Sequence, residues 1–394
     1  MMHLLEQFDF AALRDMLDQL GADGWLLYDF RGVNPAAKRV LGLNGMGTRR
    51  FFVLLPRSGK PVALAHQIEL TSFDGFPGDV RPYAAWTELH EKLRALVGGK
   101  TVAMEISPRD DVPYLDRVPH GVVELIEAAG AHVISSGMLV SRFAARWSPS
   151  ELAGHRKAAE AIAQIAQETL RWAGSELARG AEVRETMAQA RVLEAFARAS
   201  LVTDHGPIVG FQSNAANPHY EPKPGSDRRL AAGDVLLLDL WAGVAADSVY
   251  ADQTWMAVAG REPREDVRGA WDVVRGARDA AVALLKDRWQ KKQPVTGAAV
   301  DDAARAVIRN AGFGDYFVHR TGHSIDRDLH GSGPHIDNFE TADERTLIAG
   351  IGFSIEPGVY FTGRFGVRSE INVYLGEAGP EVTPKMPQQE LLLV

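Results

Sequence analysis

Three histidines stand close together in a segment rich in Gly, Asp and Arg. His319, His323 and His330 lie within twelve residues of one another. Imidazole titrates near neutral pH and is the commonest metal ligand in proteins. One of the three could bind a metal ion while the other two assist a reaction, provided that carboxylates arrive from elsewhere in the chain. The same residues could instead be hydrogen-bonded loop histidines, so the segment alone does not decide the chemistry.

Four carboxylates at the borders or centres of apolar stretches meet this requirement. Asp239 interrupts an otherwise apolar run, and Asp252 opens the next one. A buried acid is costly unless it is paired or binds a metal. Glu356 comes directly before a Pro-Gly turn, and Glu370 follows an alternating segment. Together with His323, these acids could hold two divalent cations and leave positions for water.

The donor set and the composition also indicate which metals to expect. Carboxylate oxygens with a single imidazole favour manganese, with cobalt, zinc or iron as alternatives, over copper. The chain contains no cysteine, which excludes disulfides, thiolate chemistry and cysteine-bound zinc. We therefore expect two divalent metal ions held by oxygen and imidazole.

Length and composition are those of an ordinary soluble globular protein. The 394 residues suffice for two domains, and 46% are hydrophobic and 24% charged. A net charge of −8, without a long run of Lys or Arg, argues against nucleic acid as a partner. No apolar stretch approaches the roughly 18 residues of a membrane span. The first residues carry acids early and lack the basic start of a secretory signal, so we expect a cytoplasmic protein.

Residues 1–146 are expected to form a small α/β domain. Asp9 is placed to cap a helix that Gly21 ends. Strand-like and helical segments alternate from there. Strands are expected over 25–28, 50–56, 61–65, 101–106 and 132–135, and helices over 89–97 and 122–128.

Residues 147–394 are expected to form a second, α+β domain. Ser148, Pro149 and Glu151 have the spacing of a capping box at the start of a long helix. We infer that helices cover one face of a mostly antiparallel, curved sheet. Helices are expected over 149–177, 182–199, 265–289 and 296–311, and strands over 208–209, 235–241, 253–258, 318–320, 352–356 and 367–374.

Five motifs stand in order along the chain. They are Asn217-Pro-His219-Tyr, Asp239 with Asp252-Gln-Thr, the set His319, His323 and His330, Ile355-Glu356-Pro-Gly-Val-Tyr360, and Gly366-Val-Arg368-Ser-Glu370. Their order resembles the pita-bread-fold metallopeptidases, which include Xaa-Pro aminopeptidase, Xaa-Pro dipeptidase (prolidase) and creatinase. The resemblance covers essentially the whole chain. It implies a pita-bread catalytic domain over 147–394, preceded by a creatinase-like N-terminal domain over 1–146.

The resemblance implies a role for each of the five metal ligands. Asp239 chelates one metal ion, and Asp252 and Glu370 bridge both ions. His323 and Glu356 complete the shell of the other. The two ions share a hydroxide, which they form from water by lowering its pKa.

The resemblance also assigns catalytic helpers around these ligands. Glu356 is similar to the family's proton shuttle, which moves a proton towards the leaving imino nitrogen. His219 and His330 match side chains that hydrogen-bond the scissile carbonyl and its tetrahedral intermediate. His319 matches a histidine that lines the proline pocket, and Arg368 matches an arginine that closes over the site.

The chain departs from the family's pattern at two places. Asp239 and Asp252 stand thirteen positions apart, which is longer than the family's usual spacing and predicts a longer connection that contains Asp247. Many prolidases carry an Arg that binds the dipeptide's carboxylate, and here that position is Ala342, with Arg345 three residues on. The missing Arg bears against recognition of a free C-terminal carboxylate, and hence against strict dipeptidase specificity, whereas the longer connection has no assigned role.

The sequence as a whole predicts a binuclear metallopeptidase that cleaves the bond before a penultimate proline. Xaa-Pro dipeptides are the first choice of substrate, and an aminopeptidase acting on longer Xaa-Pro peptides is the alternative. Metal-free amidinohydrolysis of the creatinase type, and a non-catalytic peptide-binding module, are the further rivals. The intact set of five ligands argues against both. The family resemblance also favours a homodimer.

Overall fold

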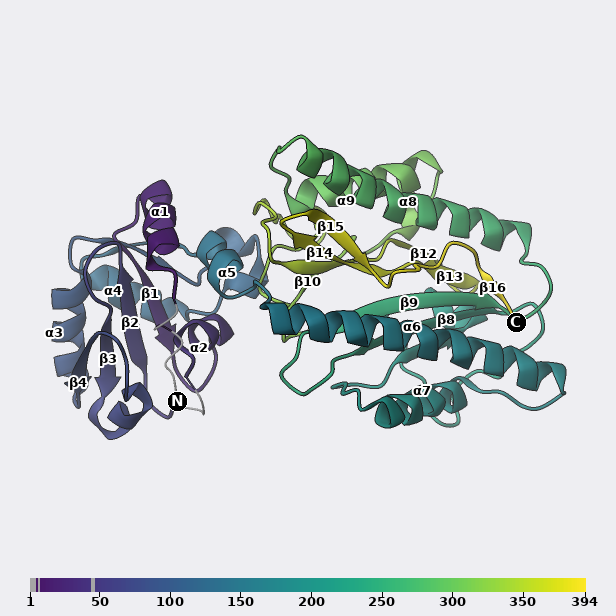
Figure 1. The fold of residues 1–394 in the computed structure, drawn as a ribbon, viewed down its shortest axis with the longest axis horizontal. Coiled ribbons are helices and arrows are strands. Elements are labelled where there is room, and N and C mark those ends of the chain that lie inside the picture. The colour runs from purple at the N-terminus through teal and green to yellow at the C-terminus, as the bar shows by residue number, and fades with distance from the viewer. Residues whose placement is uncertain (1–4, 6–7, 44–46) are drawn as a thin grey trace. The chain divides into compact units, whose positions relative to one another are not determined.

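The structure, a computed structural model, describes residue 5, residues 8–43 and residues 47–394. Most of the N-terminal stretch considered for a secretory signal lies outside these described residues. The chain divides into two compact units, Met1–Ala144 (unit 1) and Ala145–Val394 (unit 2), coloured purple to blue and teal to yellow in Figure 1. Over the described part of the chain, no helix combines the length and the apolar character needed to cross a membrane.

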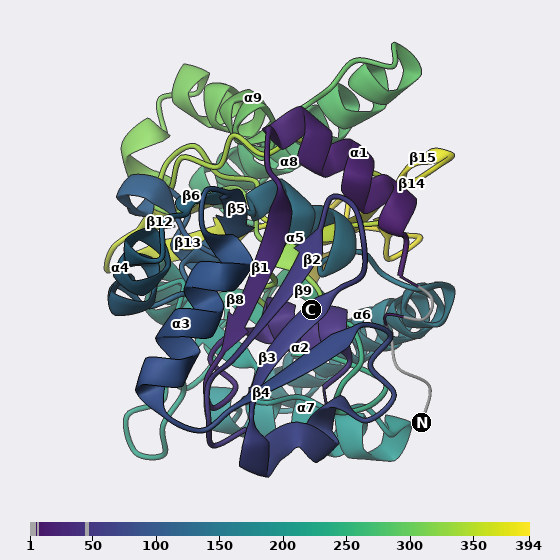
Figure 2. The same cartoon turned by 90° about the vertical axis from the view of Figure 1, so that its left-hand side faces the viewer.

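Unit 1 is a single six-stranded sheet with helices on both faces, and Figure 2 looks onto its strands. Because side chains alternate along a strand, Trp25 and Leu27 pack on one face and Leu26 and Tyr28 on the other. The strand order is β4-β3-β2-β1-β5-β6. The strands are β1 (Gly24–Asp29), β2 (Phe51–Pro56), β3 (Val62–His66), β4 (Asp79–Tyr83), β5 (Thr101–Met104) and β6 (His132–Ser135), and the helices are α1 (Phe10–Leu20), α2 (Pro35–Leu41), α3 (Trp86–Val97), α4 (His120–Ala128) and α5 (Gly137–Phe143).

Unit 2 combines mostly antiparallel sheets, in which only β16 pairs in parallel among the described strands, with two pairs of helices. The sheet orders are β16-β9-β8-β7, β10-β11-β14-β15 and β12-β13. The helices are α6 (Pro149–Ala178), α7 (Glu185–Ala199), α8 (Glu265–Gln290) and α9 (Gly297–Asn310). The strands are β7 (Ile208–Phe211), β8 (Val235–Ala242), β9 (Ala251–Val258), β10 (Ser324–Ile325), β11 (Gly352–Ile355), β12 (Gly358–Phe361), β13 (Phe365–Arg368), β14 (Ile371–Gly376), β15 (Gly379–Thr383) and β16 (Leu392–Leu393).

The two helix pairs of unit 2 lie on opposite sides of its strands (Figure 1). Helices α6 and α7 share a buried core with β8 and β9, whereas α8 and α9 pack on β11 and β14. The predicted capping box at the start of α6 is confirmed, because Ser148 Oγ accepts from Glu151 N and Glu151 Oε2 accepts from Ser148 N. The interior between the outer helix layers is therefore lined by the inner faces of two sheets.

Three expected elements of unit 2 were wrong in kind or extent. Residues 318–320 form no strand, because side chains satisfy their backbone: Glu340 accepts from Arg320 N, and Arg305 donates to His319 O. Residues 367–374 are two strands, since β13 pairs with β12 whereas β14 pairs with β11 and β15. Helix α7 starts three residues later than expected because Val183 O accepts from Leu230 N in an extended bridge.

The remaining expected elements are confirmed with ends shifted by a few residues, and several short ones were not predicted. Helix α1 shows why the end signals worked. Asp9 caps its first turn by accepting from Ala12 N, and Gly21 ends it with a left-handed φ of 64°. Short elements such as α2 and β12 lack a pattern long enough to stand out from their flanks.

A buried histidine of α6 makes the stability of unit 2 depend on pH. His155 is 0% exposed, and its ring nitrogens bond Tyr250 O at 2.7 Å and Thr383 Oγ1 at 2.9 Å. Burial lowers its pKa to about 4, with smaller opposing contributions from Tyr250 and Glu381 and a lowering one from Arg156. Below pH about 6.5 the unfolded chain binds a proton that folded His155 excludes.

We predict that this contribution to stability is complete above pH about 6.5 and falls by at most about 3 kcal/mol as the pH drops towards 4. Urea unfolding between pH 7.5 and 4.5 would measure it against His155→Gln, which keeps a hydrogen-bonding side chain and does not titrate. The native protein should lose stability more steeply than the variant. Parallel curves for the two proteins would contradict the prediction.

Candidate metal centre

One half of the candidate site lies on the inner face of the sheet that contains β8 and β9. Leu238 and Leu240 of β8 pack in the core with α6 and α7, so the alternation of side chains turns Asp239 the other way. On β9, Asp252 and Thr254 share this inner face, and Thr254 pairs with Asp239 in register. Both predicted aspartates therefore reach the same side of one sheet.

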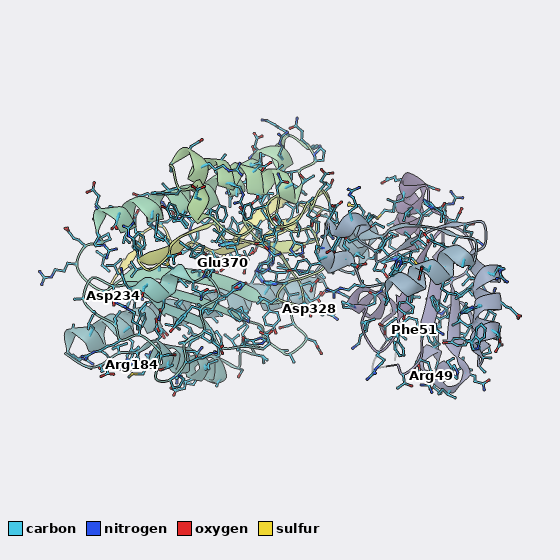
Figure 3. All side chains as sticks on the ribbon, turned by 180° about the vertical axis from the view of Figure 1, so that it is seen from behind. Arg49, Phe51, Arg184, Asp234, Asp328 and Glu370 are labelled. Atoms are coloured by element: carbon cyan, nitrogen blue, oxygen red, sulfur yellow. The ribbon has the colours of Figure 1, made fainter. Side chains whose placement is uncertain are left out.

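The other half of the site comes from β11 and β14. The apolar side chains of these strands pack towards α8 and α9, which turns Ser354 and Asn372 inward. The Asn372 side chain accepts from Asp252 N at 2.9 Å and donates to Asp252 O at 2.7 Å, and so joins the two sheets. Glu356 follows β11 directly and Glu370 precedes β14. Figure 3 shows Glu370 in the interior of unit 2.

Three of the predicted ligands form a compact buried group. The ligand atoms of Asp252, His323 and Glu370 all lie within 4.8 Å of one another. His323 Nε2 is 3.4 Å from Asp252 Oδ2 and 3.3 Å from Glu356 Oε1. These contacts bring four residues from four segments of the chain close together.

Two atoms of this group are prepared for a cation. His323 Nδ1 is 3.1 Å from the carbonyl oxygen of Ser324, which can only accept, so Nδ1 carries the proton and Nε2 presents its lone pair to the carboxylates. Asp252 Oδ1 is buried and has no hydrogen-bond partner within the described residues. A buried carboxylate oxygen without a donor is costly, and a bound metal ion would satisfy it.

The four buried acids also repel one another, and added positive charge would reduce this repulsion. Burial raises the pKa of Asp239, of Asp252 and of Glu356. The pKa of Glu370 rises well above its ordinary value through burial and then through the charges of Asp252 and Glu356. Arg368 opposes each of these shifts without cancelling it. Divalent cations would offset this repulsion, so the donor set fits the metal ions expected from the sequence.

Arg368 lies among the acids and is only 3% exposed. Its guanidinium forms an ion pair with Asp239, and its Nε donates to Thr254 Oγ1 at 2.7 Å. The Thr254 hydroxyl in turn donates to Glu370 Oε2 at 2.8 Å. Arg368 and Glu370 therefore point to the same side, and Arg368 is the ion-pair partner of Asp239.

The remaining predicted histidines take different positions. The His330 ring lies 4.3 Å from the His323 ring, centroid to centroid. Partial desolvation, followed by neighbouring charges that include His219, lowers the pKa of His330. Both His219 and His330 are exposed, so they border the open side of the site. His319 is half-buried, and its Nε2 is 2.8 Å from the Tyr360 hydroxyl.

Several side chains that shape the site were not among the predicted site residues. Three of them lie two positions from a predicted ligand, so the alternation of side chains along an extended chain could have found them. The fourth is a tyrosine whose hydroxyl bonds His319 and meets an Arg368 nitrogen at 3.5 Å, a contact that no local pattern indicates. These residues are Thr254, Ser354, Asn372 and Tyr360.

The two departures from the expected pattern have clear structural positions. Asp247 is exposed in the turn that joins β8 to β9. Arg345 is buried, pairs with Asp343 at 2.6 Å and donates to the carbonyl oxygens of Ser332 and Gly333 at 2.8 and 2.7 Å. These bonds commit the Arg345 guanidinium to its own loop.

Comparisons with known proteins find a matching family, similar sequences and a similar solved structure. The pattern of metallopeptidase family M24 matches residues 153–377. A probable dipeptidase PepE of Mycobacterium tuberculosis is 30% identical over 355 residues, which cover 87% of this chain and 85% of that protein. An Xaa-Pro dipeptidase of Lactobacillus delbrueckii subsp. lactis is 34% identical over 224 residues, 56% of this chain and 55% of that one. The crystal structure of dipeptidase PepE from Mycobacterium ulcerans has a TM-score of 0.75 at 27% identity, covering 98% of this chain and 96% of that chain.

We predict that Asp252→Ala and Glu370→Ala each lower the metal content of the purified protein, because each removes an oxygen from the compact group. Elemental analysis after dialysis against metal-free buffer measures the ions retained per chain. Asp247→Ala is the matched control, since it removes a nearby carboxylate that is exposed in a turn. Equal metal content in all three variants would contradict the assignment of this group.

Proposed function

The chain belongs to metallopeptidase family M24, and from that premise we propose that it is a binuclear, metal-dependent Xaa-Pro dipeptidase of the prolidase type. Membership of the family and likeness to a solved relative over nearly the whole chain confirm the pita-bread fold class and the peptidase chemistry predicted from the sequence. The single observation that carries the site proposal is the buried group of Asp252, His323 and Glu370.

The proposed ligands of two divalent ions are Asp239, Asp252, His323, Glu356 and Glu370. Bound divalent ions lower the pKa of water and polarise a carbonyl group. Manganese is our first choice, with cobalt, zinc or iron as alternatives, because four of the five donors are carboxylates. The unpartnered Asp252 Oδ1 and the raised pKa values of the acids support this assignment.

The other chemical steps are assigned to side chains that reach the open part of the site. The Glu356 side chain remains 14% exposed and lies beside His323, so we assign it the transfer of a proton from the attacking water to the imino nitrogen of the leaving group. His219 and His330 are assigned to donate to the scissile carbonyl oxygen as it gains negative charge.

His319 and Arg368 are assigned supporting roles. His319 would form one wall of the proline pocket, held in place by the Tyr360 hydroxyl. Arg368 would orient Asp239 and, through Thr254, Glu370. Both assignments rest on the side chains that these two residues contact rather than on direct access to substrate.

Substrate length is the main choice within this function. The similar proteins named above are dipeptidases, which supports an Xaa-Pro dipeptide as substrate. The Arg345 guanidinium binds Asp343 and loop carbonyl oxygens, so it is not directed at a substrate carboxylate. This favours an aminopeptidase that acts on longer Xaa-Pro peptides. We place the dipeptide first.

We propose the same organisation for the protein as a whole that the sequence predicted. Residues 1–146 would form a creatinase-like N-terminal domain and residues 147–394 the catalytic domain. The peptide substrate is the expected partner, together with a second copy of the chain in a homodimer. A cytoplasmic location is consistent with the absence of cysteine and with a net charge of −8.

We predict manganese-dependent hydrolysis of Ala-Pro that exceeds hydrolysis of Ala-Pro-Ala, with little turnover of Ala-Ala or creatine. The purified protein would be assayed on all four compounds with and without added manganese. Faster cleavage of Ala-Pro-Ala would identify the longer-peptide aminopeptidase. If neither proline peptide is cleaved in the presence of metal, the peptidase proposal fails.

We predict that His330→Ala keeps its metal ions but lowers kcat by about 10²- to 10³-fold, because it removes a donor to the developing oxyanion. Elemental analysis and steady-state kinetics on Ala-Pro would be run side by side. His120→Ala, an exposed histidine on α4 of unit 1, is the matched control. Loss of metal in His330→Ala would show that His330 is a ligand and that the proposed division of roles is wrong.

A further inference from the structure

The His219 side chain does not hold its own loop in place. The imidazole is exposed and makes no hydrogen bond or ion pair among the described residues, so the backbone must set its position. That backbone forms a tight turn, in which Asn217 Oδ1 accepts from His219 N and Asn217 O accepts from Tyr220 N, both at 3.1 Å. The turn follows a short 3-10 helix over Gln212–Ala216.

A single buried carboxylate fastens both ends of this segment. Glu185, the first residue of α7, is 0% exposed. Its Oε1 accepts from Phe211 N at 2.6 Å and from Asn214 Nδ2 at 3.1 Å. Its Oε2 accepts from the Tyr220 hydroxyl at 2.7 Å and from Arg228 N at 2.6 Å. The donors come from before, within and after the turn that presents His219. Figure 3 labels Arg184, the residue before this carboxylate, and Glu370 of the metal centre.

The opposite side of the segment rests on β13 of the metal centre. A Cβ built on Gly366 would lie 2.0 Å from Ala215 O, so only glycine permits this close approach. The Pro218 carbonyl oxygen lies 3.5 Å from an Arg368 nitrogen. The segment is thus held between Glu185 and the strand that leads to Arg368.

We propose that Glu185 is a positioning residue for the reaction, and that it holds His219 at the open side of the metal centre through Tyr220, Asn214 and the backbone. The proposal rests on the proposed function for its kinetic consequences. Four donor groups converge on one buried carboxylate whose own α7 packs on the outer side of β8 and β9. Because the carboxylate stands on a helix, the loop is held by a rigid element and not only by contacts within the loop.

Tyr220 offers the most selective way to test this role. Burial, and then the bond to Glu185 and its charge, raise the pKa of Tyr220, so its hydroxyl remains a donor to the carboxylate. Tyr220→Phe removes this one bond and keeps the ring. Glu185→Gln is the stronger change, because an amide nitrogen then faces at least one of the donors that converge there.

Matched controls exist in unit 1. Tyr83 is a tyrosine whose hydroxyl makes one hydrogen bond, to Arg50 O at 2.6 Å, and Tyr83→Phe removes it. Glu105 is a 1% exposed carboxylate that accepts hydrogen bonds from Trp25, Asn34 and Ser136. Glu105→Gln therefore disturbs a buried carboxylate network of the same kind as the one that Glu185→Gln disturbs. These controls report the general cost of damaging a buried bond of the same kind.

The experiment compares metal content, thermal unfolding and Ala-Pro kinetics across these variants. We expect Tyr220→Phe to keep its metal and its unfolding temperature while kcat falls about 10-fold. In the His219→Ala background the same change should have little further effect, because Glu185 acts through His219. Tyr83→Phe should leave kcat unchanged. Additive losses in the double variant, or an unaffected kcat in Tyr220→Phe, would overturn the proposal.

A second measurement keeps this inference independent of the proposed function. Hydrogen exchange of the amides over residues 211–220 reads the mobility of the loop without any substrate. Exchange there should become faster in Tyr220→Phe and in Glu185→Gln, but not in the Glu105→Gln control. If exchange becomes faster in these two variants but the protein cleaves no proline peptide, the proposed function is wrong and the role of Glu185 in holding the loop stands. Unchanged exchange in an active enzyme would refute the role of Glu185.

Discussion

The structure of unit 2 depends on the cost of burying four carboxylates at one point. Asp239, Asp252, Glu356 and Glu370 face one another inside the protein, and burial raises the pKa of each. Two well-packed sheets would not retain such a group for stability alone, because an uncompensated buried charge is destabilising. Bound cations would make the arrangement favourable. In the proposed metal centre, the local loss of stability would be offset by the binding of positive charge.

The surrounding protein keeps these acids in place with polar side chains rather than with apolar packing. Asn372 bonds both backbone groups of Asp252, and Thr254 bonds Arg368 and Glu370. Each of these partners lies on a strand that is apolar on its other face, so the helix layers fix the strands and the strands fix the donors. Arg368 supplies a permanent positive charge among the acids, and it is committed to Asp239.

The parts of the site that could be predicted are those that a short stretch of sequence indicates. Asp239 and Asp252 stand out because an acid interrupts or opens an apolar run, and His323 stands out because histidines cluster around it. The segment 318–320 reads as a strand, yet its backbone bonds to Arg305 and Glu340, which are 14 and 20 residues away from their partners. Likewise nothing near Arg368 in the chain indicates that Asp239, 129 residues earlier, is its partner. Local patterns therefore predict ligands and elements, whereas the contacts between distant segments require the fold.

The same distinction separates the metal ligands from the residues that would contact substrate. The ligands lie on or next to strands whose register is set by packing, so their geometry follows from the fold. His219 and His330 lie on loops, and a loop needs a separate anchor before it can place a donor accurately. For the His219 loop that anchor is the buried carboxylate of Glu185, which accepts hydrogen bonds from four donor groups. In the loop after His330, Arg345 binds Asp343 and two backbone carbonyls. Two buried charged residues, Glu185 and Arg345, thus hold the loops whose histidines would contact substrate.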